Sequence, residues 1–191
     1  MAPLAPHERV LVSQDYFKTD HAEKACEECH GGNPAAVART DAHKGVVKDP
    51  TEAPPFGPAG TLICAECHEE QAKTGQTSLH ATLSSFSVVL KARSGDDKDH
   101  WDNVVDPGRK NHCTACHSSC GQCHVSRPKF AKSGLIKGHV FLKKPDMVNQ
   151  CMACHGSRVG DEYTGDRGLG DVHLSKKGLD CVACHGGAEM H

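Results

Sequence analysis

Six copies of the pattern C-x-x-C-H constrain this chain more than any other feature. They begin at Cys26, Cys64, Cys113, Cys120, Cys151 and Cys181, and together they use all twelve cysteines of the sequence. Two thiols three positions apart can add across the two vinyl groups of one porphyrin, and the histidine that follows then lies beneath the iron as its proximal ligand. The spacing therefore predicts six covalently attached haems.

The predicted cofactor-binding residues are the two cysteines of each unit. They are Cys26, Cys29, Cys64, Cys67, Cys113, Cys116, Cys120, Cys123, Cys151, Cys154, Cys181 and Cys184. The predicted proximal iron ligands are the histidines that close the units, namely His30, His68, His117, His124, His155 and His185. No cysteine remains for a disulfide, a zinc site or a nucleophile.

Paired cysteines also occur in zinc knuckles, in thiol-redox motifs and in disulfide-bonded frameworks. None of these requires a histidine directly after the second cysteine of every pair, whereas covalent haem attachment does. The sixfold recurrence of that histidine favours c-type haem over the alternatives.

The composition is poor in the residues that build an apolar core. Of the 191 residues, only 37% are hydrophobic and 4% aromatic, while Gly and Pro number 19 and 10. A chain of this length normally buries a core of its own. We therefore expect the porphyrins to supply the apolar interior of one domain, residues 1–191, with residues 1–20 as an N-terminal arm. The expected fold is mostly irregular, with short α-helices near the C-x-x-C-H units and little or no β-sheet.

Two segments show helical patterns, and two others do not. Good helix formers predict a helix over residues 64–73, and an apolar stripe at helical spacing predicts another over 79–92, packed on neighbouring haem faces. Residues 93–110 are polar and turn-rich, and residues 49–60 hold four prolines, which indicates a stiff linker.

The histidines outside the motifs are candidates for the second iron ligand. Fifteen histidines less six leaves nine, more than six haems require. The strongest candidates lie in loops or near helix ends that can fold back over a haem: His43, His80, His139, His173 and His191. For the sixth we favour His21 over His112, because His112 adjoins Cys113 and can reach only a different haem. His7 and His100 are reserves.

The third and fourth units are separated only by Ser118 and Ser119. In a helix, the seven residues from Cys113 to Cys120 rise about 10 Å, so the two haems must lie nearly in contact. We expect them to form the middle of an electron path, with the haems at Cys26 and Cys181 as its exits.

The formal charge is -2, and the propionates of six haems would make the holoprotein acidic. No basic tract indicates nucleic-acid binding, and no apolar run approaches the 18 residues of a transmembrane segment. Covalent haem is generally attached outside the cytoplasmic membrane. We therefore expect a periplasmic or extracellular protein in its mature form, after removal of a signal peptide.

Several stretches resemble multihaem c-type cytochromes of anaerobic respiration in prokaryotes. They are Ser119-Cys120-Gly-Gln-Cys123-His124-Val-Ser-Arg127-Pro128, Cys154-His155-Gly-Ser-Arg158, Asp171-Val-His173 and Cys181-Val-Ala-Cys184-His185-Gly-Gly, and the resemblance runs from about residue 21 to residue 191. It implies low-spin, bis-histidine haems in a closely spaced chain, with no catalytic residues.

The expected function is electron transfer, with redox proteins or identical subunits as partners. Two physical forms stay open: a soluble carrier, and a subunit of a homo-oligomeric cytochrome filament. A multihaem reductase with one open iron position is the enzymatic alternative, although the chain lacks the C-x-x-C-K unit found in many nitrite reductases.

Overall fold

The computed structural model describes residues 12–52, 63–112, 118–165, 168 and 170–191. The third C-x-x-C-H unit (113–117, with Cys113, Cys116 and His117), His7 and most of the expected linker lie outside these residues. The α-helices are α2 (Cys26–His30), α3 (Arg39–Ala42), α4 (Glu69–Gly75), α5 (Leu79–Thr82), α6 (Ser84–Ser94), α7 (Lys98–His100), α8 (Asp106–His112), α9 (Cys120–His124), α10 (Met152–His155), α11 (Asp161–Thr164), α12 (Val172–Lys177), α13 (Cys181–Cys184) and α14 (Gly187–Met190).

Single turns of other helix types connect them. The 3-10 turns are η1 (Tyr16–Lys18), η2 (Asp20–Glu23), η3 (Pro50–Glu52), η4 (Ile63–Glu66) and η7 (Lys129–Ala131), and the π-helical turns are η5 (Trp101–Val105), η8 (Met147–Cys151) and η9 (Gly156–Gly160). In the described residues, β pairing is limited to two isolated bridges, Ser126 with Leu135 and Lys137 with His139. The expectation of short helices with little or no sheet is confirmed.

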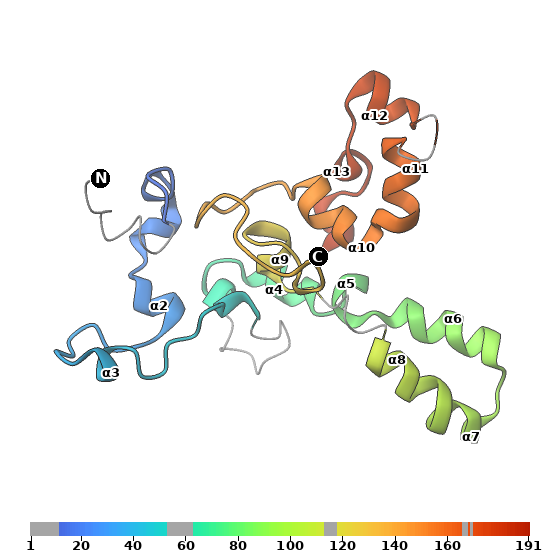
Figure 1. Ribbon diagram of the computed structural model, residues 1–191, viewed down its shortest axis with the longest axis horizontal. Coiled ribbons are helices and arrows are strands. Elements are labelled where there is room, and N and C mark those ends of the chain that lie inside the picture. Colours follow the sequence, from blue (N-terminus) through green and yellow to red (C-terminus); the bar gives the residue numbers. More distant parts are fainter. Residues whose placement is uncertain (1–11, 53–62, 113–117, 166–167, 169) are drawn as a thin grey trace.

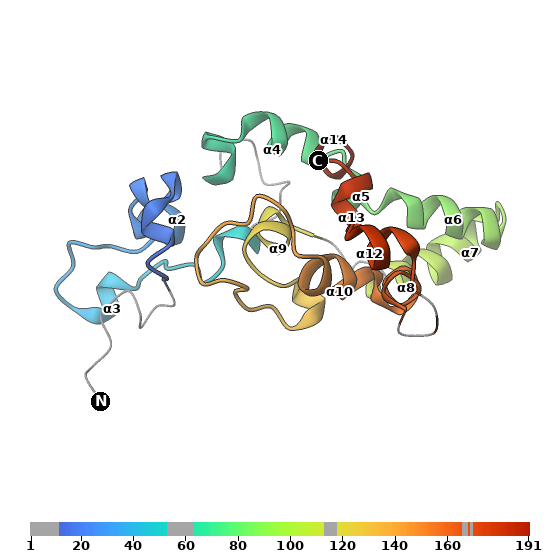
Figure 2. The same ribbon diagram turned by 90° about the horizontal axis from the view of Figure 1, so that it is seen from above.

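The helices spread into an open framework (Figures 1 and 2). Both views place α2 and α3 at one end, the α6–α8 hairpin at the other and α9 near the centre, and in Figure 1 α10–α13 form a separate lobe. None of the helices in the described ranges has the length and apolar character needed to cross a membrane.

The framework buries very little apolar surface. Among the described residues the buried apolar side chains are Ala81, Leu83 and Val125, whereas fourteen large apolar residues are exposed. The accessible surface is 13422 Å², while a compact monomer of this mass would expose about 8,800 Å². The polypeptide alone therefore does not form a conventional core, in agreement with its composition.

The helix expected over residues 79–92 is divided in two. Ser78 caps α5 by accepting a hydrogen bond from the Ala81 amide at 3.2 Å, and α6 begins at Ser84. Leu83, between them, is buried and has a left-handed backbone with φ of 50°. A leucine rarely adopts that conformation, so the break depends on how Leu83 packs and not on the local sequence pattern.

The segment 93–110 is more helical than expected. The π turn η5 joins α7 directly to α8, so the helical segment is continuous over residues 98–112, and Pro107 is the second residue after the π turn. Lys91 of α6 lies over the Trp101 ring at 5.0 Å and fixes the two arms of the hairpin against each other.

Candidate haem-binding units

Five of the six C-x-x-C-H units lie in the described residues, and each is built on a helical turn. The first is α2, the second runs from η4 to His68, the fourth is α9, the fifth spans the junction of η8 and α10, and the sixth is α13 followed by His185. In a helix, positions i, i+3 and i+4 share one face. The local structure therefore presents both thiols and the histidine of each unit on a common side.

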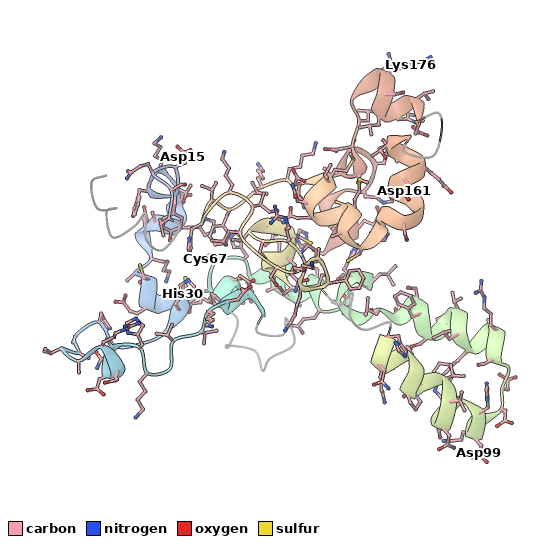
Figure 3. The ribbon with its side chains drawn as sticks, in the orientation of Figure 1. Asp15, His30, Cys67, Asp99, Asp161 and Lys176 are labelled. Atoms are coloured by element: carbon pink, nitrogen blue, oxygen red, sulfur yellow. The ribbon has the colours of Figure 1, made fainter. Side chains whose placement is uncertain are left out.

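Electrostatic contacts join the first unit to the second. Glu28 caps α2 by accepting a hydrogen bond from the Ala25 amide at 2.7 Å, and Lys24 contacts Glu28 at 3.1 Å. The same ammonium reaches Glu66 of η4 at 3.2 Å. Figure 3 marks His30 of the first unit and Cys67 of the second.

The exit from α2 requires two glycines. Gly31 and Gly32 have φ of 70° and 96°, and a Cβ on either would lie 2.8 Å from a carbonyl oxygen, of Gly45 and Ala42 respectively. The close backbone approach therefore folds the 42–47 loop against α2. As a result the Val47 carbonyl accepts a hydrogen bond from Nδ1 of His30 at 2.8 Å.

The fourth unit lies at the best-packed point of the chain. Gly121 and Gln122 of α9 are buried, as is Val125 just beyond it. A Cβ on Gly121 would overlap the side chain of Thr51 in η3. Gly121 is thus the position at which the segment before the second unit packs against the fourth.

We expect Gly121→Ala to lower the melting temperature of the protein. The added methyl group overpacks the contact with Thr51, and overpacking of this kind costs about 1–3 kcal/mol. The matched control is Gly75→Ala at the end of α4, where no atom lies within 4 Å of the added Cβ. Thermal unfolding followed by circular dichroism measures both, and equal melting temperatures would contradict the prediction.

The fifth unit is tied to the exit of the fourth. Asp146 caps η8 by accepting a hydrogen bond from the Asn149 amide at 2.6 Å. The buried Gln150 donates from Nε2 to the Ser126 carbonyl at 2.9 Å. Cys151 follows directly, so these bonds fix the helix that carries the fifth unit against α9.

The sixth unit is held from outside its own helix. Lys144 forms an ion pair with Asp180, the residue before Cys181, at 2.6 Å. Nδ1 of His185 lies 3.1 Å from both carboxylate oxygens of Glu189 in α14. A carboxylate on Nδ1 orients an imidazole and raises its basicity as a metal ligand.

None of the ten described cysteines forms a disulfide. The Cys64 thiol shares a hydrogen bond with Cys120, which raises the pKa of Cys64 and lowers that of Cys120 to about 6. Burial and the neighbouring Cys181 raise the pKa of Cys151 to about 12, and burial raises that of Cys123 to about 11. Thiols of different units therefore lie side by side.

Several histidines have a fixed orientation. Nδ1 of His124 donates to the Leu142 carbonyl at 2.7 Å, and Nδ1 of His191 donates to the Gly187 carbonyl at 2.9 Å. Nδ1 of His43 bonds the Arg39 carbonyl at 2.8 Å in the same manner. An imidazole held through Nδ1 keeps Nε2 available for a metal.

Four pairs of histidine rings lie at nearly one distance. The ring centres are 6.0 Å apart for His30 and His139, 6.2 Å for His68 and His21, 6.0 Å for His124 and His191, and 6.2 Å for His155 and His80. Each pair joins one motif histidine to one of the histidines selected as a candidate second ligand.

The remaining candidates lie elsewhere. His43 and His173 are exposed, and Nδ1 of His173 contacts Asp171 at 2.8 Å. His112 is exposed at the end of α8. No sequence pattern indicates Phe141, which stacks on His21 with ring centres 4.0 Å apart, or the carbonyls that orient the imidazoles.

The donor set fits covalent haem better than a bare metal ion. Within the described residues, no group of three or more His, Cys, Asp or Glu side chains could hold a metal ion. Paired thiols outside disulfides, an adjacent imidazole and exposed apolar side chains are what a porphyrin needs. The haem would be held by the thiols through its vinyl groups and by the motif histidine through its iron.

Comparison with known proteins shows similarity to a cytochrome. The chain is 25% identical over 192 aligned positions to a high-molecular-weight cytochrome c of Nitratidesulfovibrio vulgaris, strain Hildenborough. The alignment covers 85% of this chain but 34% of the relative, so the chain spans about a third of that protein's length. No family model matches the chain, and no solved structure matches it significantly. The chain is a distant homologue of a c-type cytochrome.

Proposed function

We propose that this chain is a hexahaem c-type cytochrome, a single domain that transfers electrons between redox partners. The observation that carries the proposal is the helical turn in every described C-x-x-C-H unit. In the second and sixth units the histidine follows the helix, and its amide still donates to the carbonyl of the first cysteine. The distant homology to a high-molecular-weight cytochrome c supports it. When bound, each haem would supply one iron that alternates between the ferric and ferrous states.

The choice between electron transfer and catalysis depends on the second iron ligand. An iron with two histidines has no position for a substrate, whereas a reductase needs one open position. Histidines outside the motifs outnumber the units, nine to six. We therefore propose bis-histidine ligation throughout and no catalytic residue.

Interactions between thiols of different units support close spacing of the five described haem sites. Cys64 forms a hydrogen bond with Cys120 and Cys151 with Cys181, while Cys29 and Cys123 interact only electrostatically with Cys64 and Cys151. Each thiol marks the edge of the porphyrin that it would hold. Successive porphyrin edges would thus be close enough for electrons to pass between them.

The proposed setting is the periplasm or the cell exterior, where covalent haem is attached. In that setting the chain would act as an electron carrier or conduit between other redox proteins. An acidic holoprotein would meet such partners through basic patches on their surfaces.

Mass spectrometry under denaturing conditions tests the cofactor content. We expect the mass of the polypeptide plus six haems, because covalent attachment survives unfolding. The apoprotein in which all twelve cysteines are replaced by serine is the control, and it should carry none. A protein lacking one or more haems would refute the assignment of the corresponding units.

The spectrum of the same sample distinguishes a carrier from an enzyme. The ferric protein should be low-spin at every site, without the weak near-infrared band that accompanies methionine ligation. A full complement of haem with a substantial high-spin signal would instead support a reductase.

A further inference from the structure

We propose that four histidines outside the motifs are the second axial ligands of four identified haems. His139 serves the first unit, His21 the second, His191 the fourth and His80 the fifth. This assignment rests on the proposed function and goes beyond it, because it specifies which distant segment closes each haem.

The separation of the rings is the first argument. Metal–imidazole bonds are about 2 Å long and the bonding nitrogen lies about 1 Å from the ring centre, so two imidazoles on opposite sides of one iron have centres about 6 Å apart. The four measured separations are 6.0 Å, 6.2 Å, 6.0 Å and 6.2 Å. They agree with that requirement and with one another.

The angles between the rings are the second argument. They are 64° for His30 and His139, 26° for His68 and His21, 5° for His124 and His191, and 78° for His155 and His80. A ring that binds iron through one nitrogen can rotate about that bond without changing the separation of the centres. A constant distance with a variable angle is therefore the pattern expected of two ligands on one iron.

Ordinary aromatic packing is the alternative explanation. Aromatic pairs are found with ring centres about 4.5–7 Å apart, so a single pair at 6 Å would carry little weight. Ordinary packing in the described residues covers this range, since His21 stacks on Phe141 at 4.0 Å and His139 lies 6.0 Å from Tyr16 at an angle of 70°. What distinguishes the four histidine pairs is their membership, because each joins a motif histidine to a histidine remote in sequence.

The orientation of the rings agrees with ligation. In the His124 and His191 pair, both Nδ1 atoms donate to carbonyl oxygens, at 2.7 and 2.9 Å, so both Nε2 atoms stay available.

The assignment leaves His43 and His173 as candidates for the third and sixth units. It also favours His21 over His112, since His21 lies opposite His68 while His112 is exposed at the end of α8. Each assigned haem would connect two segments far apart in the chain and so act as a tertiary cross-link.

The first test is His191→Ala in the protein carrying its haems. One iron in six should lose its second ligand, so about one sixth of the ferric haem should become high-spin in electron paramagnetic resonance. The ferrous form should bind carbon monoxide in the same proportion. His100→Ala is the matched control: it removes an exposed histidine of α7 that none of the pairs includes, and it should leave all haems low-spin.

The second test identifies the haem that opens. In a background lacking the fourth haem through Cys120→Ala and Cys123→Ala, adding His191→Ala should open no further haem. In a background lacking the first haem through Cys26→Ala and Cys29→Ala, it should still open one. An open haem in the first background, or none in the second, would overturn the pairing.

If His191→Ala does not fold, His191→Met replaces it in the same design. Methionine also ligates haem iron, so one haem should then show the near-infrared band of methionine ligation. Six low-spin haems with no such band would refute the pairing but leave the proposed function intact. Missing haems in the unsubstituted protein would instead refute the proposed function.

Discussion

Without its haems, the chain should lose nearly all of its helical circular dichroism. The longest α-helix of the described part is α6, with 11 residues, and the longer continuous segments, 98–112 and 147–164, consist of α-helical pieces of three to seven residues joined by π-helical turns. Isolated helices shorter than about 12–15 residues are marginal in water. Packing cannot compensate, because the buried apolar side chains of the described residues are Ala81, Leu83 and Val125.

The measurement compares the haem-bearing protein with the variant in which serine replaces all twelve cysteines. We expect the variant to show the far-ultraviolet spectrum of a disordered chain and little dispersion of its amide proton resonances. The variant lacking only the first unit's cysteines, Cys26 and Cys29, is the intermediate control and should lose structure locally. A twelve-serine variant that keeps its native helical signal would show that the polypeptide folds without haem.

The dependence on haem explains which local structures the sequence could predict. Each described unit forms a helical turn, as expected near the C-x-x-C-H units, and α4 ends at Gly75, close to the predicted end at residue 73. The helix predicted to begin at Cys64 is, however, divided at His68, which separates η4 from α4. These predictions concern residues close in sequence. They needed no knowledge of how the chain packs.

The errors arose where distant residues or overlooked local pairs determine the backbone. The helix over 79–92 breaks at Leu83, which is buried in a left-handed conformation that its sequence does not favour. In the segment 93–110, Lys98 pairs with Asp102 and Lys110 with Asp106, at the spacing that stabilises helices. The spacing of these two ion pairs can be read from the sequence, although Pro107 and Gly108 indicate a turn.

The residues of the candidate site also fall into those that the sequence predicts and those that it does not. The C-x-x-C-H pattern predicts the motif histidines, and position in loops or near helix ends predicts the four histidines whose rings lie about 6 Å from theirs. Their pairing was not predictable, since it depends on contacts such as that of His30 with the Val47 carbonyl. Every residue has a backbone carbonyl, so the sequence does not indicate which one accepts a hydrogen bond from a histidine.

The thiol contacts lead to the largest expected effect on electron transfer, at the fourth unit. The Cys120 thiol forms a hydrogen bond with Cys64 of the second unit, and Cys123 interacts electrostatically with Cys151 of the fifth. Both views of the framework place α9 near its centre (Figures 1 and 2). The haem carried by α9 would therefore connect the first two units with the last two.

Removing that haem through Cys120→Ala and Cys123→Ala should divide the path. Electrons can be introduced at the far end by a ruthenium photosensitiser on Lys176→Cys of α12, an exposed position marked in Figure 3. With a sacrificial donor present, the haems of the first and second units should no longer be reduced in the fast phase. About three of the five remaining haems at most would then be reduced rapidly, out of the six units of the sequence.

The control carries Cys26→Ala and Cys29→Ala and also keeps five haems. The first unit lies at the end of this series of thiols. Among the thiol interactions named above, Cys29 interacts electrostatically with Cys64 of the second unit and with no later unit. Its loss should leave a continuous path from α12, so all five remaining haems should be reduced in the fast phase. Since both variants lose one haem, a difference in their fast phases reports the position of the haem. Equal fast phases would show that the fourth unit does not connect the two halves.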